Sequence, residues 1–326
     1  MHILVTGGAG YIGSHACRAL VQAGYIPVAY DNLSKGRRSA VQWGPFEEGD
    51  MTDRARLDQV FDAYKPAAVM HFAARIEVGE SVTNPAKYWR NNFIGSLTLA
   101  EAMRDAGCDR LVFSSTCAVY DGNTQADLTE ESPIGPINAY GGAKRATEMM
   151  LADFGAAHGL QSTIFRYFNV AGAAAGAGIG QTHEGATHII PRLLTALEGG
   201  MAAMTIYGDD YPTPDGTCVR DYIHVDDLVA AHLAGLNRLL EAGGSRIYNL
   251  GTGRGASVRE VIEAAARVVG HAPDIQTGPR RAGDAVRLVS GSARATEELG
   301  WMPKSSDLET ILADAWAWHK SRGWQT

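Results

Sequence analysis

The sequence of 326 residues has few cysteines, little proline and no long apolar run. Its cysteines are widely separated and match no zinc or CxxC spacing, which predicts reduced thiols in an intracellular protein. No run of about 18 apolar residues occurs, so a membrane-spanning helix is not expected. The chain enters an apolar segment directly at its N-terminus, with no basic stretch or cleavage signal before it, and a cytoplasmic location is predicted. The cysteines are Cys17, Cys108, Cys117 and Cys218.

An excess of basic charge is also missing. The chain has 29 Lys and Arg against 36 Asp and Glu, a net charge of −7. Binding to nucleic acid or to an anionic membrane depends on clustered Lys and Arg, so neither is expected as the main partner. The ten histidines include no HxxxH or HExxH pair, and no metal is expected.

Glycine, in contrast, is abundant. The chain has 38 glycines, where a typical usage of about 7% would give roughly 23. They are not periodic and are accompanied by only 12 prolines, which excludes collagen-like and low-complexity chains. We therefore expect many of these glycines to occupy particular turns and close contacts.

The first two-thirds of the chain alternates short apolar runs with longer amphipathic stretches. Strands are predicted at 2–6, 26–30, 67–71, 110–114 and 161–166, and helices at 12–23, 53–63, 85–106 and 140–158. The apolar runs do not alternate with polar residues, as expected of strands that are buried on both faces. The pattern predicts an α/β fold, a Rossmann-like doubly wound parallel sheet whose ligands bind beyond the carboxyl ends of the strands.

After about residue 170 this rhythm is lost. Strands are still expected at 247–250 and 286–289, and helices at 225–240, 258–269 and 308–320. We predict a Rossmann domain over residues 1–170, to which later segments can return, and a smaller C-terminal α/β lobe mainly over 171–326 that binds the substrate. The boundary is approximate.

A dinucleotide-binding loop is predicted where the first strand ends. Gly7, Gly10 and Gly13 match a GxxGxxG fingerprint, in which the glycines allow a tight turn, approach of a pyrophosphate and close packing of the helix. Asp31 ends the next apolar run, where a carboxylate binds the adenosine ribose and repels a 2′-phosphate. NAD is therefore favoured over NADP, although Lys35, Arg37 and Arg38 lie nearby. A P-loop is excluded because Gly13, not lysine, precedes Ser14.

A proton-transfer pair is predicted at the start of a later helix. Tyr140 and Lys144 stand four residues apart and so share a helix face. Spacing alone equally suits a packed tyrosine beside a solvated lysine. However, the preceding strand ends in Ser114, Ser115 and Thr116, which places hydroxyl groups at the ligand edge of the same sheet. A lysine and a bound nicotinamide both favour the phenolate, so these residues could oxidise an alcohol together with NAD.

Eleven short motifs occur in one order that resembles a known family. They are GGAGYIGSH, DNLSKG, EGDM, HFAA, VGES, FSSTCAVY, AYGGAK, RYFNVAG, YGDDYPTPDGTCVRDYIHVDDL, YNLGTG and RRAGD. Together they resemble the UDP-glucose (UDP-galactose) 4-epimerases of the extended short-chain dehydrogenase/reductase family, from residue 1 to about residue 320. The segment from Tyr207 to Leu228 is particularly specific.

The resemblance implies an isomerase that holds NAD tightly and inverts C4 of a UDP-sugar through a transient 4-keto sugar. Tyr140 would be the general base, Lys144 would orient the ribose and lower the phenol pKa, and Thr116 would relay or steady the proton. The keto sugar must then turn about its pyrophosphate, which requires firm binding of the nucleotide and loose binding of the sugar. A homodimer packed through helices 85–106 and 140–158 is also implied.

The resemblance also assigns binding residues. The implied cofactor contacts are Gly7, Gly10, Tyr11, Ile12, Gly13, Asp31, Asn32, Leu33, Ser34, Gly36, Asp50, Met51, Phe72, Ala73, Ala74, Asn91, Ser114, Tyr140, Lys144 and Phe168. The implied substrate contacts are Thr116, Tyr140, Asn169, His188, Ile189, Thr205, Ile206, Tyr207, Arg220, Arg281, Asp284 and Leu288.

Some positions depart from the family pattern. Ile76 replaces a frequent lysine near the cofactor, and Leu288 occupies the position that gates sugar size. UDP-galactose and UDP-glucose are the expected substrates, with a UDP-N-acetylhexosamine or a UDP-pentose as alternatives. A 4,6-dehydratase is disfavoured because Cys117 and Ala118 follow Thr116 where such enzymes carry Asp-Glu. A non-catalytic NAD-sensing protein is a further alternative.

Overall fold

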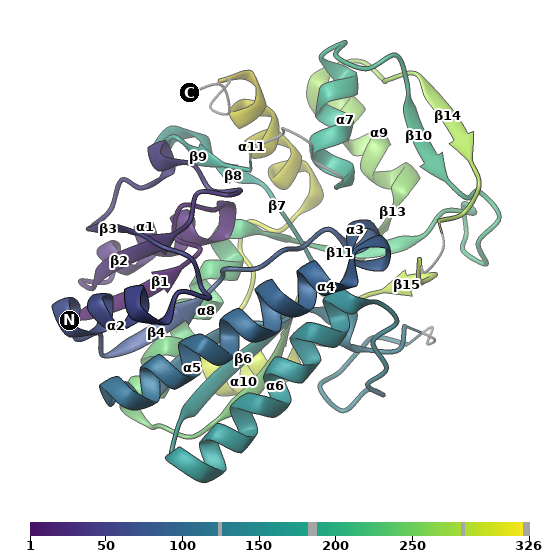
Figure 1. The fold of residues 1–326 in the computed structure, drawn as a ribbon. Helices are drawn as coiled ribbons and strands as arrows, with labels where there is room; N and C mark the ends of the chain where they lie inside the picture. Colours follow the sequence, from purple (N-terminus) through teal and green to yellow (C-terminus); the bar gives the residue numbers. More distant parts are fainter. Residues whose placement is uncertain (123–125, 182–187, 282–283, 322–326) are drawn as a thin grey trace.

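The centre of the molecule is a parallel sheet of seven strands, shown in Figure 1. The computed structural model describes residues 1–122, 126–181, 188–281 and 284–321. The strand order is β12-β6-β5-β4-β1-β2-β3 and every neighbouring pair is parallel. The predicted doubly wound sheet is therefore confirmed. The strands are β1 (His2–Thr6), β2 (Ile26–Asp31), β3 (Phe46–Glu48), β4 (Ala68–His71), β5 (Arg110–Ser114), β6 (Gln161–Tyr167) and β12 (Arg246–Leu250).

Helices cover both faces of this sheet, because its strands bury side chains on each side. On one face, Ile3 and Val5 belong to a core that includes Leu20 and Leu236. On the other face, Leu4 packs in a second core with Leu99 and other helical side chains. The first face is covered by α1 (Tyr11–Gln22), α8 (Val225–Glu241) and α10 (Ala293–Leu299), and the second by α2 (Arg54–Tyr64), α5 (Gly95–Ala106) and α6 (Ala139–His158).

The sheet contains strands from both halves of the chain. Strand β12 pairs with β6 and places Tyr248 beside Phe165, although 83 residues separate the two positions. Helix α8 packs against α1 and against strands β5 and β6. The apolar sequence of 247–250 predicts a strand, but only the pairing shows which sheet it joins.

The single helix predicted at 85–106 is divided. Its parts are α4 (Pro85–Tyr88), a π-helical turn (Trp89–Ile94) and α5, and the short α3 (Val78–Thr83) precedes them. At the π-helical turn, the buried Asn92 side chain binds the backbone of Arg75 through both its amide atoms, at 2.8 and 2.9 Å. Since Arg75 follows β4, this contact fixes the helix to the carboxyl end of the sheet.

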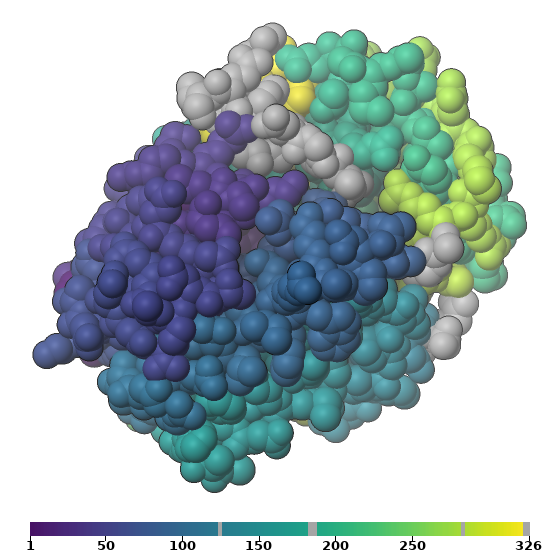
Figure 2. Space-filling model, viewed as in Figure 1, coloured from purple at the N-terminus to yellow at the C-terminus, as the bar shows by residue number. Residues whose placement is uncertain are grey.

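A second lobe contains most of the residues after 170. Its core is formed by side chains such as Leu194, Ile206, Ile262 and Leu312. Figure 2 shows its green and yellow-green atoms beside the purple and blue N-terminal residues. Its helices are α7 (Ile189–Leu197), α9 (Val258–Val269) and α11 (Leu308–Lys320). Its strands are β7 (Asn169–Ala171), β8 (Ala173–Ala174), β9 (Ile179–Gly180), β10 (Met204–Tyr207), β11 (Val219–His224), β13 (Gly255–Ser257), β14 (Ile275–Gly278) and β15 (Arg287–Leu288).

Three short 3-10 helices complete the described structure: η1 (Arg38–Ala40), η3 (Cys117–Val119) and η4 (Ala175–Ala177). Within the described ranges, no helix combines the length and apolar character needed to cross a bilayer.

Candidate functional site

The glycine-rich loop joins β1 to α1. Helix α1 begins after Gly10, which has no side chain to cap the N–H groups of the first turn. A Cβ at Gly7 or Gly13 would lie 2.7 Å from Ala73 N or 2.1 Å from Gly7 O, so the fold itself requires both glycines. A Cβ at Gly10 would meet only Gly7 O, at 3.1 Å. Internal packing therefore constrains Gly10 less severely than Gly7 or Gly13, and close approach of a ligand is a second reason for a glycine there. Tyr11 and Ile12 follow at the uncapped helix start.

Asp31 lies at the end of β2, beside this loop. Its carboxylate accepts hydrogen bonds from Ala9 N at 3.1 Å and Leu33 N at 2.8 Å. Burial raises the pKa of Asp31, although these two N–H groups oppose the shift. The buried carboxylate retains acceptor positions for a ribose hydroxyl.

The loop after Asp31 is linked to the segment after β3. Asn32 donates to the Asp50 carboxylate at 2.7 Å and accepts from Ser34 N at 3.0 Å. Leu33 has a positive φ of 55°, and a Cβ at Gly36 would come within 2.9 Å of Ala9. Met51, beside Asp50, is buried. The predicted cofactor residues of both segments thus lie along one edge of the sheet.

The segment after β4 carries the next predicted cofactor residues, Phe72, Ala73 and Ala74. Phe72 packs 5.1 Å from the His232 ring, and Ala73 faces the glycine loop. Asn91 is half-buried in the π-helical turn, whereas its neighbour Asn92 makes the buried contacts described above. Sequence reasoning missed Asn92, whose role depends on the π-helical turn.

Tyr140, Lys144 and Thr116 converge at the carboxyl end of β5. All three are buried, with exposed fractions of 8%, 3% and 6%. Lys144 Nζ donates to the Ser114 carbonyl at 2.7 Å, and the Thr116 hydroxyl is within hydrogen-bonding reach of the Tyr140 phenol. Asn138 caps α6 by accepting from Gly141 N at 2.9 Å, which places Tyr140 in the first turn. The structure therefore brings the three predicted catalytic residues together.

Burial dominates the protonation of this group. It raises the pKa of Tyr140 well above that of a free phenol, and the Thr116 hydrogen bond opposes the shift. Burial also lowers the pKa of Lys144 to about 7, against the attraction of Glu148. In the protein alone the phenol is therefore neutral at neutral pH. A ligand that supplies positive charge would shift it toward the phenolate.

A buried ion pair between Glu148 and Arg166 lies next to the predicted catalytic residues. Glu148 receives two hydrogen bonds from Arg166, at 2.9 and 2.7 Å, and one from the Ser115 hydroxyl at 2.6 Å. Arg166 NH1 in turn donates to the Tyr120 hydroxyl at 3.1 Å. Sequence reasoning did not select Glu148 or Arg166. The available signal was a carboxylate four residues after Lys144, on the same helix face.

In the second lobe, two arginine side chains make cation–π contacts with tyrosine rings. Arg281 lies 3.9 Å above the ring of Tyr207, the last residue of β10, and Arg280 lies 4.2 Å above the ring of Tyr211. Arg220 NH2 is 3.8 Å from the Asp284 carboxylate. Arg220 and Arg281 are the residues predicted to bind the diphosphate, and Asp284 is the one predicted at a ribose hydroxyl. Thr205 and the buried Ile206, predicted at the uridine, lie with Tyr207 on β10.

The remaining predicted substrate residues occupy several elements. Asn169 begins β7 and pairs with Tyr222 of β11, which ties the end of β6 to the second lobe. Leu288 packs against a small core that includes Phe168 and Tyr120. His188 is exposed at the start of α7, and Ile189 follows it half-buried.

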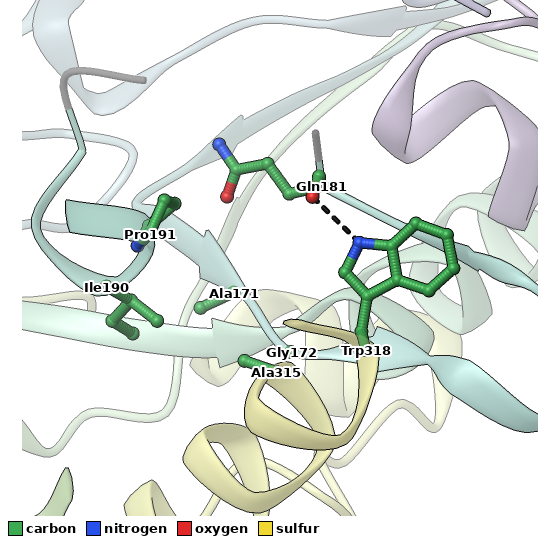
Figure 3. Close-up of a pocket in the computed structure, with 7 residues that line it drawn as sticks. All are labelled: Ala171, Gly172, Gln181, Ile190, Pro191, Ala315 and Trp318. Carbon is green, nitrogen blue, oxygen red and sulfur yellow. Dashed lines mark hydrogen bonds between the residues drawn. The ribbon is translucent and has the colours of Figure 1, made fainter. Parts of the chain in front are cut away.

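The segment after β7 packs on α11. Figure 3 shows Trp318 donating from its indole nitrogen to the Gln181 carbonyl, at 2.8 Å. A cavity of about 10 Å³ beside this bond has room for at most one water molecule. It is a packing gap and not a substrate site. A second cavity, of about 30 Å³, lies at the glycine loop and is lined by Gly10, Tyr11, Lys35 and Arg37 among others.

Comparison with known proteins identifies the family of the chain. Residues 3–251 match the model of the NAD dependent epimerase/dehydratase family. The chain belongs to this family. It is 49% identical over 321 residues to a UDP-glucose 4-epimerase of Rhizobium meliloti, covering 98% of each chain.

Solved structures of 4-epimerases are also similar to this chain. A UDP-glucose 4-epimerase from Brucella ovis in complex with NAD has a TM-score of 0.94 and 47% identity, covering 97% of both chains. A UDP-Glc/GlcNAc 4-epimerase from Campylobacter jejuni has a TM-score of 0.85 and 41% identity, covering 98% of this chain and 99% of the other.

Proposed function

We propose that the protein is an NAD-dependent isomerase that inverts C4 of a UDP-sugar through a transient 4-keto sugar. The observation that carries the proposal is the convergence of Tyr140, Lys144 and Thr116 at the carboxyl end of β5. NAD fits the residues present, because the uncapped start of α1 suits a pyrophosphate and Asp31 suits a ribose. When bound, NAD supplies a hydride acceptor that can return the hydride.

The protein's own residues move the proton. Tyr140 takes the proton of the C4 hydroxyl and later returns it, since its phenol lies in the first turn of α6 at the sheet edge. Thr116 steadies the phenolate by donating a hydrogen bond. Lys144 lies one helical turn after Tyr140 and is held by the Ser114 carbonyl, and its protonated form favours the phenolate.

The two lobes divide the binding work in this proposal. Residues 1–170, together with α8 and β12, hold NAD, and residues 171–326 mainly hold the UDP-sugar. Arg220 and Arg281 bind the diphosphate through charge-assisted hydrogen bonds, with Asp284 at a ribose hydroxyl and Thr205 to Tyr207 at the uridine. The sugar contacts fewer charged side chains, which leaves it free to turn.

UDP-galactose and UDP-glucose are the expected substrates. Leu288 packs against the core that contains Phe168. The family resemblance associates a tyrosine at this position with simple hexoses, and leucine is smaller, so a UDP-N-acetylhexosamine is the second candidate. Similarity to a UDP-Glc/GlcNAc 4-epimerase is compatible with both sugars. A UDP-pentose requires the same C4 chemistry and stays an alternative.

Incubation of the purified protein with UDP-galactose tests the proposal. UDP-glucose should form without added NAD, because tightly held cofactor is expected to remain bound. Absence of turnover, even after NAD is supplied, would contradict the proposal and favour a non-catalytic NAD-binding protein. A panel of UDP-hexoses, UDP-N-acetylhexosamines and UDP-pentoses then identifies the preferred sugar.

A homodimer is part of the proposal. Helices α5 and α6 lie side by side in Figure 1, and apolar side chains of this region are exposed. Trp89, Ile94 and Met149 are 40%, 45% and 55% exposed, which suits a surface covered by a second copy. Sedimentation of the wild-type protein should give twice the chain mass, and Met149→Glu should shift the protein toward monomer. A monomeric wild-type protein would contradict this part.

A further inference from the structure

The hydroxyl of Tyr211 is buried and has no hydrogen-bond partner within the described residues. Only 5% of the residue is exposed. Its ring is held firmly, because Arg280 lies 4.2 Å above it and a Cβ at Gly208 would come within 2.6 Å of it. Arg280 is itself paired with Asp210 at 2.7 Å. The position of this hydroxyl is therefore determined by packing and not by a hydrogen bond of its own.

The Tyr211 phenol interacts electrostatically with charged groups of the proposed diphosphate site. Burial is the main cause that raises the pKa of Tyr211, and Asp284 and Cys218 raise it further. Arg280 and Arg220 oppose this shift. Arg220 NH2 and the Asp284 carboxylate are 3.8 Å apart. The next arginine along the chain, Arg281, is stacked on Tyr207. Tyr211 thus belongs to the same cluster as the residues assigned to the diphosphate.

An unpaired buried hydroxyl is unfavourable for the protein alone. A buried donor without a partner loses its hydrogen bonds to water, whereas a phenylalanine ring would fill the same space without that loss. Packing therefore explains the ring of Tyr211 but not its oxygen. A ligand with an acceptor oxygen would explain the oxygen, since a phenol donates well to an anionic group.

We infer that Tyr211 is a further binding residue for the uridine diphosphate part of the substrate and that its hydroxyl donates a hydrogen bond to a phosphate oxygen. This inference rests on the proposed function and adds a residue to its diphosphate site. Arg220 and Arg281 supply the positive charge there, and Tyr211 supplies a neutral donor of fixed direction. Because the contact is to the nucleotide and not to the sugar, it stabilises ground state and transition state alike.

Tyr211→Phe and Tyr248→Phe form a matched pair for the test. The Tyr248 hydroxyl donates to Glu298 at 2.8 Å, and it lies in β12 away from the proposed diphosphate site. Affinity for UDP and for uridine is measured by calorimetry on the full-length protein, and the thermal midpoint is measured without nucleotide.

Tyr211→Phe should weaken UDP binding about tenfold, as expected for a lost hydrogen bond to a charged group. Its thermal midpoint should stay the same or rise, its KM should rise and its kcat should not change. Tyr248→Phe should lower the thermal midpoint and leave UDP affinity unchanged. If Tyr211→Phe weakens the binding of UDP but not of uridine, the contact is at a phosphate, as inferred. If the variant weakens the binding of both ligands equally, the contact is at the ribose, and the inference is contradicted.

Besides equal weakening of UDP and uridine binding, two further results would overturn the inference. One is UDP affinity of Tyr211→Phe equal to wild type, and the other is a thermal midpoint that falls as far as in Tyr248→Phe. Failure of the wild-type protein to bind UDP at all would instead contradict the proposed function, so the two failures are distinguishable.

Discussion

The two ends of the proposed substrate site are built differently. Below Tyr140 and Lys144, the buried charges of Glu148 and Arg166 are matched by partners inside the protein. At the nucleotide end, Arg280 and Arg281 are exposed, and the Tyr211 hydroxyl has no hydrogen-bond partner in the described part of the chain. The proton-transfer end is thus organised by the fold, whereas the nucleotide end has polar groups that a ligand can satisfy. This difference suits an enzyme that must hold its nucleotide firmly and keep its catalytic groups fixed.

The largest effect is expected from a variant that removes the counter-ion of Arg166 at the proton-transfer end. Glu148→Gln should lower the free energy of unfolding by about 3–5 kcal/mol, because Arg166 would keep a buried charge without its counter-ion. Urea unfolding of the protein measures the change. Glu309→Gln is the control, since its ion pair with Arg267 is exposed and contributes at most about 1 kcal/mol. A loss below about 1 kcal/mol for Glu148→Gln would show that this pair does not organise the site.

The next effect removes the proposed base. Tyr140→Phe should lower kcat at least about a hundredfold, the lower end for loss of a general acid-base group. Its affinity for UDP should be unchanged, because the phenol acts at the sugar and not at the nucleotide. Initial rates with UDP-galactose measure kcat, and calorimetry measures UDP binding. Near-normal turnover would refute the role of Tyr140.

The third effect concerns the sugar between the two ends. Leu288→Tyr should lower turnover of UDP-N-acetylgalactosamine relative to UDP-galactose by about tenfold, since added bulk near Phe168 leaves less room for the acetyl group. Competing-substrate rates measure this ratio in wild type and variant. If wild type is completely inactive on the acetylated sugar, Leu288 is not a permissive gate.

The smallest effect is expected at the exposed nucleotide end. Arg281→Met should raise KM about fivefold with little change in kcat, because a charge-assisted bond near the surface is weakened by solvent. Steady-state kinetics over a range of UDP-galactose concentrations separate the two constants. A fall in kcat with constant KM would mean that Arg281 acts at the reaction itself and would remove the contrast between the two ends.

Much of the sheet and its ligand edge could be predicted without the structure. The apolar runs at 2–6 and 110–114 coincide with β1 and β5, and the helix that carries Tyr140 and Lys144 was predicted to within a residue at its start. These features depend on residues close together in the chain, where periodicity and capping act directly. The division of helix 85–106 was not predictable, since the π-helical turn depends on the contact between Asn92 and Arg75.

The sequence by itself determined the glycine loop, most of the strands and helices of the Rossmann half, and the residue types available for proton transfer. Only the tertiary structure decided that β12 returns to the sheet, that Arg166 neutralises Glu148, and that the Tyr211 hydroxyl finds no partner among the described residues. The reason is physical. Local spacing fixes which side chains share a helix face or a turn, whereas burial and charge pairing depend on segments that meet only after the chain has folded.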